Sequence, residues 1–99
     1  MDPIISEQSY VAVSNNQVSG SLLEGEVVIL NLKDGVYYGL NSIGGRIWDL
    51  IQEPRTASEI KDILLQEYDV EEERCTQELL ALLQDLVSHG LVEIKNKLA

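Results

Sequence analysis

The sequence contains no phenylalanine, a single cysteine, Cys75, and a single histidine, His89. One cysteine excludes an internal disulfide, and one cysteine with one histidine cannot form a metal site of nitrogen and sulfur ligands. No apolar run approaches the roughly 20 residues of a membrane span, and the N-terminus lacks the basic and apolar regions of a signal peptide. We therefore expect a cytoplasmic protein with no metal, no cofactor and no membrane association.

Basic residues are also scarce. Seven Lys and Arg stand against 17 Asp and Glu, which gives a formal net charge of -10. Because Lys and Arg neutralise the phosphates that supply most non-specific affinity for nucleic acid, we expect no DNA or RNA partner. An acidic surface suits a peptide or a protein of basic character instead.

Catalytic constellations are missing as well. Cys75 and His89 lie on one predicted helix, about 21 Å apart along its axis at 1.5 Å per residue, so they cannot form a thiol–imidazole pair. The pair Gly44-Gly45 lacks the flanking residues of a phosphate-binding loop. The sequence therefore predicts that the protein is not an enzyme. Cys75 is interpreted as a small apolar residue and His89 as a cation at a helix C-terminus.

Three β-strands are predicted, all before Asn41, from runs of branched and alternating residues. They cover residues 10–13, 26–33 and 36–40. Asp34-Gly35 is a type I′ turn signal, and a two-residue loop there would pair Lys33 with Val36. The polar residues 17–25 are interpreted as a connection.

Three helices follow. The first begins at Asn41 or Ser42, which can cap it, and Gly44 lies on its packed face as an expected contact with the sheet, whereas Gly45 does not. The second begins at a capping box, residues 56–59, and the third runs from about residue 71 to His89. Residues 91–94 form a last short strand or an extended segment.

The order of these elements predicts an α+β fold of winged helix-turn-helix type, with a three-stranded antiparallel sheet followed by three helices. At 99 residues, a single domain over residues 1–99 is expected, with flexible ends at 1–9 and 95–99.

The third predicted helix carries more apolar surface than one core requires. Its apolar arc spans about 160°, whereas somewhat over 100° is enough for packing on one side. One edge of this stripe carries Cys75, Leu79 and Leu82. A three-stranded sheet also leaves an edge of unpaired N–H and C=O groups, to which an extended peptide could be added. A short edge and a larger core explain the same pattern, and composition leaves the two interpretations even.

Residues 28–51, V-I-L-N-L-K-D-G-V-Y-Y-G-L-N-S-I-G-G-R-I-W-D-L-I, resemble the PqqD-like family. Four later segments match it in order, so the resemblance extends over about residues 10–94. They are P-R-T at 54–56, E-I at 59–60, E-Y-D-V at 67–70 and H-G-L-V at 89–92. Within the family, the frame L-x-L-x-x-G-x-Y-x-x-L-N followed by G-x-x-x-W resembles the discrete recognition proteins of lasso-peptide clusters.

The resemblance implies a non-catalytic protein that binds the leader of a ribosomally made precursor peptide and presents it to a processing enzyme. That enzyme would be a leader peptidase in a lasso pathway, or a radical enzyme in the PQQ pathway. The leader would add to the third strand and insert side chains against the third helix. Carried over to this chain, the strand side is Val36, Tyr37, Tyr38, Gly39 and Leu40. The helix side is Cys75, Glu78, Leu79, Leu82 and Leu83. Trp48 and Leu50 are assigned to the core.

Two other functions remain open from the sequence. A winged-helix regulator would bind DNA, although the presumed recognition helix has no Arg or Lys between Arg74 and Lys95. An interaction module would bind a folded protein without a leader peptide. Exposed strand edges also leave a homodimer open.

Overall fold

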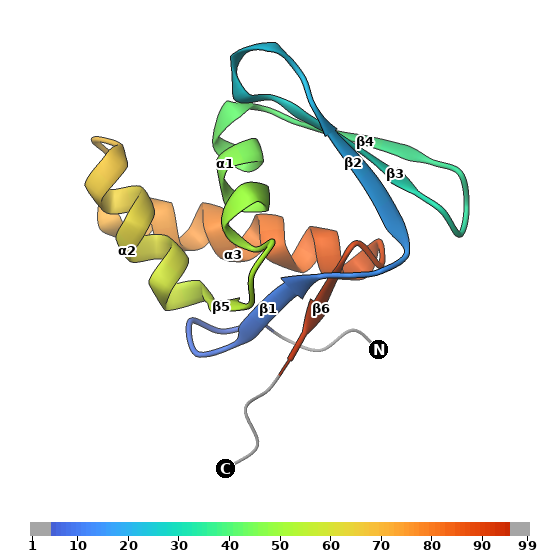
Figure 1. Ribbon diagram of the computed structural model, residues 1–99. Helices are drawn as coiled ribbons and strands as arrows, with labels where there is room; N and C mark the ends of the chain where they lie inside the picture. The colour runs from blue at the N-terminus through green and yellow to red at the C-terminus, as the bar shows by residue number, and fades with distance from the viewer. Residues whose placement is uncertain (1–4, 96–99) are drawn as a thin grey trace.

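The computed structural model describes residues 5–95 (Figure 1). It confirms an α+β protein with antiparallel sheets and three α-helices. The elements are β1 (Tyr10–Val13), β2 (Gln17–Ser21), the short 3-10 helix η1 (Leu23–Gly25), β3 (Val27–Asn31), β4 (Tyr37–Leu40), α1 (Ser42–Leu50), β5 (Arg55–Thr56), α2 (Ala57–Glu67), α3 (Glu72–Ser88) and β6 (Val92–Ile94).

The strands form two three-stranded sheets, ordered β5–β1–β6 and β2–β3–β4. The prediction of one sheet from residues 10–13, 26–33 and 36–40 is therefore wrong. Successive side chains of a strand point to opposite faces, and both Val11 and Ala12 are buried. Both faces of β1 are therefore covered. The strand pairs with β5 and β6, which makes it the central strand of its sheet. The short strand expected at residues 91–94 is confirmed as β6.

The strand β2 was missed by the sequence analysis. Its sequence, QVSGS, has a low intrinsic preference for strand. It forms because all five of its residues pair with β3, from Gln17 opposite Asn31 to Ser21 opposite Val27. On the face of β2 that is turned toward α1, Ser19 accepts a hydrogen bond from the indole Nε1 of Trp48 (3.1 Å).

The hairpin between β3 and β4 has a longer loop than predicted. Leu30 pairs with Tyr37, and Asn31 donates its N–H to the carbonyl of Val36 (2.9 Å), so residues 32–35 form the loop. The carboxylate of Asp34 accepts from the N–H of Val36 (2.9 Å), which favours this wider turn over a two-residue one. The register differs from the prediction by two residues, so every side chain stays on its expected face.

The predicted helix ends are confirmed. Asn41 caps α1 by accepting from the N–H of Gly44 (2.9 Å). Thr56 and Glu59 form the capping box of α2, and Gly90 follows α3 with a positive φ of 75°. Figure 1 shows α1 standing in the angle between the sheet β2–β3–β4 and the pair α2 and α3.

Hydrogen bonds join both ends of the described chain to the rest of the fold. Ile5 is buried and donates its N–H to the side chain of Gln84 (3.1 Å). Ser9 accepts from the N–H of Ala57 (3.1 Å), and Lys95 donates its N–H to Tyr10 (2.6 Å). The expected flexibility of residues 1–9 and 95–99 stays a prediction. Residues 1–4 and 96–99 lie outside the described residues.

The core lies where α1, α2, α3 and both sheets meet. Its largest fully buried side chains are Ile29, Ile51, Ile60, Leu83, Leu91 and Val11. Trp48 and Leu50 are buried there as predicted. Within residues 5–95, none of the helices has the length and apolar character needed to cross a membrane.

Candidate functional site: an open strand edge beside a groove

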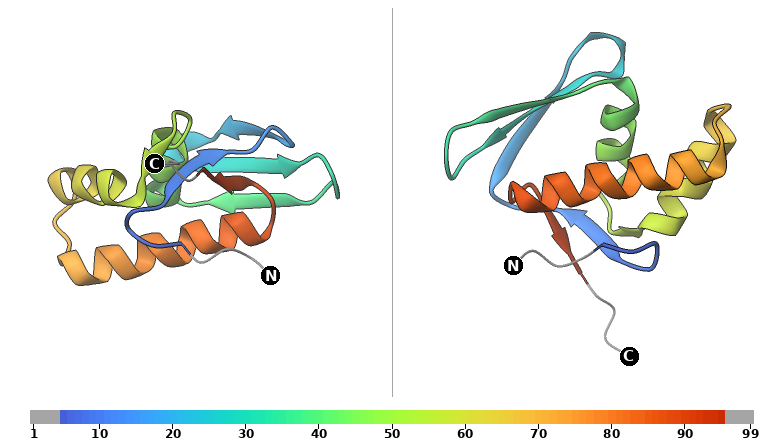
Figure 2. Two further views of the ribbon diagram at one scale, coloured as in Figure 1. Left: turned by 90° about the horizontal axis from the view of Figure 1, so that it is seen from below. Right: turned by 180° about the vertical axis from the view of Figure 1, so that it is seen from behind.

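The strand β4 forms an open edge of the sheet β2–β3–β4. The hydrogen bond from Asn31 to Val36 shows that these two residues form a hydrogen-bonded pair between β3 and β4. Because bonded and non-bonded pairs alternate in an antiparallel ladder, the N–H and C=O groups of Tyr37 and Gly39 point away from β3. Of the three strands, β4 lies nearest α3, as the view from below shows (Figure 2).

A groove of about 730 Å³ lies between the end of β4 and the N-terminal half of α3. The first turns of α1 contribute one wall, and the end of α2 with the α2–α3 loop closes the far end. Most of the lining side chains are apolar. Ile43 and Val70, which are 44% and 42% exposed, belong to this lining. The groove therefore offers unfilled apolar surface next to unpaired backbone groups.

Six of the ten residues predicted for the site line this groove. They are Gly39, Leu40, Cys75, Glu78, Leu79 and Leu82. Val36 and Tyr37 are exposed at the hairpin end of β4, and Tyr38 packs against the ring of His89 instead. Leu83 is fully buried in the core, because it lies on the centre of the apolar stripe of α3 rather than on its edge.

The remaining lining residues were not predicted from the sequence. They are Asn41, Ile43, Gly44, Ile47, Leu64, Tyr68, Asp69, Val70, Glu71 and Arg74. All come from α1, from the end of α2, or from the loop and first turn that follow it. The one sequence signal for them was an apolar residue, Val70, between the acidic residues Asp69 and Glu71. No local pattern shows which helix faces a cleft.

Polar groups at the groove are already partly satisfied. Arg74 at one rim pairs with Glu78 one turn later, with Nε 3.0 Å from the carboxylate. Burial, with the carboxylate of Glu78 nearby, raises the pKa of the Cys75 thiol, so this thiol stays protonated and is a poor nucleophile at neutral pH. Among the described residues, no group of three or more His, Cys, Asp and Glu side chains could hold a metal ion. The groove therefore offers apolar side chains and already paired charges to a ligand.

Comparison with protein families gives a match to coenzyme PQQ synthesis protein D (PqqD) over residues 26–92. This chain belongs to the PqqD family. The matched region contains β3, β4 and all three α-helices, and therefore every residue that lines the groove. The predicted family is confirmed. A search of curated proteins finds no match.

Two solved structures resemble this PqqD-family protein over most of its length. TbiB1, in complex with the TbiA(beta) leader peptide, is 34% identical with a TM-score of 0.78, covering 87% of this chain and 99% of TbiB1. A lasso peptide synthetase B1, complexed with the leader peptide, is 19% identical with a TM-score of 0.74, covering 84% of this chain and 96% of that one. At that identity the second similarity shows the fold alone. The predicted resemblance to a protein of a lasso-peptide system is therefore confirmed at the level of the fold.

The outer face of the sheet β2–β3–β4 is apolar in this PqqD-family protein. The three α-helices all lie on the other side of the sheet (Figure 1). Val18, Leu30 and Tyr37 form one row across the strands, and Gly20, Val28 and Gly39 form the next. Tyr37 is 67% exposed and Val18 is 57% exposed, and neither row contains a charged residue.

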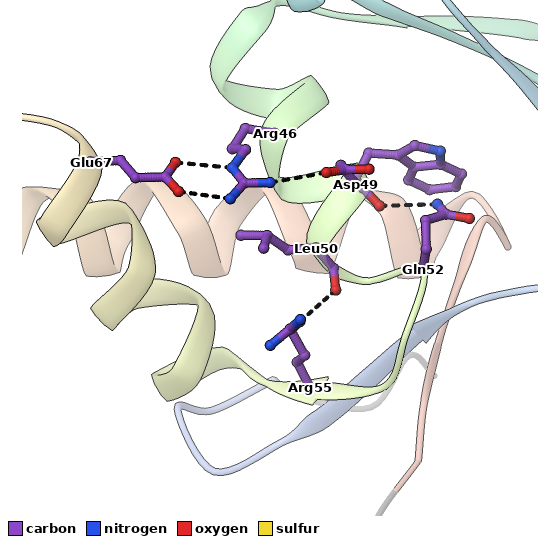
Figure 3. A network of polar contacts seen from close by, with 7 residues as sticks. Arg46, Asp49, Leu50, Gln52, Arg55 and Glu67 are labelled. Carbon is purple, nitrogen blue, oxygen red and sulfur yellow. Dashed lines mark hydrogen bonds and ion pairs between the residues drawn. The ribbon is translucent and has the colours of Figure 1, made fainter.

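Arg46 links α1 to α2 in this PqqD-family protein (Figure 3). Its guanidinium donates to both carboxylate oxygens of Glu67 on α2, at 2.9 and 2.7 Å, and to Asp49 at 2.9 Å. Arg55 donates from Nε to the carbonyl of Leu50 (2.7 Å), which joins the end of α1 to the start of α2.

The ion pair between Arg46 and Glu67 predicts a pH dependence of stability. The hydrogen bond and charge of Arg46 lower the pKa of Glu67 below its ordinary value of 4.5. The stabilisation is therefore complete above pH 4.5 and is lost as the pH falls below it. In urea unfolding, we expect Glu67→Gln to be less stable than the wild type at pH 7, and this difference to be smaller at about pH 3, because Glu67 is protonated as the pH falls below 4.5. The control Glu53→Gln removes a carboxylate without an ion pair in the described chain, and a difference from wild type that is unchanged between these pH values would contradict the prediction.

Proposed function

We propose that this protein binds the leader segment of a ribosomally made precursor peptide as an added strand on β4, and delivers it to the enzyme that processes the precursor. The observation that carries this proposal is the open edge of β4 beside the apolar groove. The protein itself performs no bond chemistry in this function. TbiB1, at 34% identity over nearly its whole length, supports the proposal because its structure holds a leader peptide.

The leader backbone hydrogen-bonds to the groups of Tyr37 and Gly39 that point away from β3. Alternate side chains of the added strand then point to the same face as Tyr38 and Leu40. On that face the walls are Leu79 and Leu82 of α3, so apolar leader side chains are buried in the groove. The other side chains face solvent on the outer side of the sheet.

The expected affinity follows from the size of this contact. Each main-chain hydrogen bond contributes about 1 kcal/mol net, and each of two or three apolar anchors contributes about 1.5–3 kcal/mol when fully buried. Ordering the peptide costs roughly 2–5 kcal/mol. We therefore expect dissociation constants between nanomolar and micromolar. A bound leader then raises the effective concentration of the attached core peptide at the enzyme.

The apolar outer face of the sheet supports the delivery step. Larger exposed apolar patches mark interaction sites, and this face, with Val18 and Tyr37 exposed, shares Tyr37 and Gly39 with the edge that takes the leader. An enzyme seated there would contact both this protein and the bound leader. In a lasso-peptide pathway the enzyme is a leader peptidase. In a PQQ pathway it would be a radical enzyme, and reconstitution with each purified enzyme distinguishes them.

A pair of substitutions at Gly39 tests leader binding. Its N–H points to the open edge, and a methyl group there meets no atom within 4 Å. Gly39→Pro removes the N–H at an edge position that tolerates proline, whereas Gly39→Ala retains it. In fluorescence-anisotropy titrations with the labelled leader of the neighbouring precursor gene, we expect Gly39→Ala to bind like the wild type. Gly39→Pro should bind about 10- to 100-fold more weakly, because a leader carbonyl is left unpaired.

Either of two results would contradict the proposal. The first is no saturable leader binding by the folded wild type at high micromolar concentration. The second is equal binding by Gly39→Pro and Gly39→Ala, which would place the leader away from the β4 edge. A salt-dependent gel shift with duplex DNA would instead favour the regulator, to which the winged-helix interpretation of the fold also belongs; that interpretation stays a prediction.

A further inference from the structure

The sheet β2–β3–β4 is tied to α3 at His89, the residue that ends this helix. The side-chain amide of Asn31 donates from Nδ2 to the carbonyl of His89 (2.8 Å). The ring of Tyr38 lies against the ring of His89, with centroids 4.8 Å apart. The residues of α3 that line the groove end at Leu82, about 10 Å before His89 at 1.5 Å per residue. The tie is therefore at one end of the space between β4 and α3, and the groove is at the other.

Asn31 is also part of the hairpin that presents β4. Its side-chain Oδ1 accepts from the N–H of Lys33 (2.9 Å), and its carbonyl accepts from the N–H of Gly35 (2.8 Å). The residue is 5% exposed, so its amide is buried and satisfied on both sides. The carbonyls of a last helical turn have no partner within the helix, and Asn31 supplies one for His89.

His89 is itself held in place. Its backbone N–H donates to the carbonyl of Asp85 (3.2 Å), and its Nδ1 lies 2.8 Å from the same carbonyl. Burial, with the carboxylates of Asp34 and Asp85, raises the pKa of Tyr38, so the phenol that packs on His89 stays neutral. These contacts leave the hairpin little freedom to rotate on the end of α3.

We infer that Asn31 is a positioning residue for leader binding: by fixing the β3–β4 hairpin to the end of α3, it sets the width of the groove. This inference rests on the proposed function. A leader strand must bond to the β4 edge and bury side chains against α3 at the same time, and a misplacement of about 1 Å is enough to spoil such a site. Asn31 acts at a distance, because it does not line the groove.

Two substitutions loosen the tie in different ways. Asn31→Asp keeps the acceptor for Lys33 and replaces the donor to His89 with an oxygen that faces the carbonyl. His89→Ala removes the ring contact with Tyr38, retains the backbone carbonyl, and alters a residue whose side chain is 41% exposed, so it folds even where Asn31→Asp does not. At a temperature at which each variant is fully folded, we expect leader dissociation constants to rise about tenfold for Asn31→Asp and about threefold for His89→Ala.

The control is Thr56→Ala, which removes the cap of α2 and lowers the melting temperature without touching the hairpin. We expect it to bind the leader like the wild type. A second readout uses a leader whose groove-facing apolar residues are replaced by alanine. These replacements should weaken binding by a smaller factor with Asn31→Asp than with the wild type, the two factors differing by up to the tenfold that Asn31→Asp itself loses, because the widened groove contacts those side chains less well. A purely structural role would leave this ratio unchanged.

The inference fails if folded Asn31→Asp and His89→Ala bind the leader as tightly as the wild type, or if Thr56→Ala loses the same affinity. A failure of the proposed function gives a different result, because the wild type itself then binds no leader. In that case both leader binding and the positioning role of Asn31 are excluded.

Discussion

Leu30→Lys is expected to separate leader binding from leader processing. Leu30 lies in the middle of the outer face, between Val18 on β2 and Tyr37 on β4. Its side chain is half-buried and points away from the groove. Placing an unpaired ammonium group in the centre of a desolvated interface costs about 2–5 kcal/mol, so the affinity for the processing enzyme should fall by two to three orders of magnitude. Leader affinity should change less than threefold.

Two measurements on the same variant check this result. Anisotropy with the labelled leader gives the affinity of the β4 edge. The rate of precursor cleavage by the purified leader peptidase is then measured with and without this protein. The increase in rate that the protein causes reports how well it delivers the precursor to the enzyme. The matched control is Ala81→Lys, which adds the same charge to an exposed position of α3 and should leave both quantities unchanged. Normal cleavage with Leu30→Lys would show that the enzyme docks elsewhere.

Sedimentation of the wild type distinguishes an enzyme from a second copy on this face. Each copy carries a formal charge of -10, so two copies repel each other, and neither row of the outer face offers a basic residue to offset this. A partner with basic residues around an apolar centre is favoured instead. A dimer that Leu30→Lys dissociates would assign the face to self-association and overturn the delivery step.

The parts of the fold that local chemistry determines could be predicted from the sequence. The capping box at Thr56, the Asn41 cap and the positive φ of Gly90 each depend on a few neighbouring residues. The pairing of β1 and the existence of β2 could not be predicted in this way, because distant partners decide them. The hairpin register was wrong by two residues because Asp34 bonds to a backbone N–H and supports a wider turn.

The candidate site also has parts that could be predicted from the sequence and parts that could not. The apolar edge of α3 at Cys75, Leu79 and Leu82 follows from helical periodicity, and the resemblance to the PqqD family placed β4 opposite it. The α1 wall and the α2–α3 loop could not be predicted, because periodicity gives the buried face of a helix but not the neighbour that covers it. The helical wheel assigned the close contact of α1 to Gly44, whereas the tighter approach is at Gly45.

Gly45→Ala is expected to destabilise the fold strongly. A methyl group on Gly45 would overlap the backbone carbonyl oxygen of Gly25 and press on the side chain of Val27. Gly25 has a positive φ of 79°, next to Glu24 at 61°, so the η1 loop cannot easily withdraw. Overpacking typically costs about 1–3 kcal/mol and occasionally more. Overlap with a backbone atom places Gly45→Ala at the upper end of that range, and the better helix propensity of alanine offsets at most about 1 kcal/mol. A net loss of about 2–3 kcal/mol should lower the melting temperature by roughly 10–20 °C.

Gly44→Ala is the matched control, because it makes the same change one residue earlier in the same helix. Its nearest neighbour is the Cβ of Leu40 at 3.2 Å, a tight contact that is relieved if the end of the edge strand β4 moves by a few tenths of an ångström. We expect a change below about 1 kcal/mol. If Gly45→Ala were as stable as Gly44→Ala, the approach of η1 to α1 would not constrain the fold. If it is much less stable, the sheet is fixed at two places, at Gly45 beside α1 and at His89 on α3, and the groove is the space that these two contacts hold open.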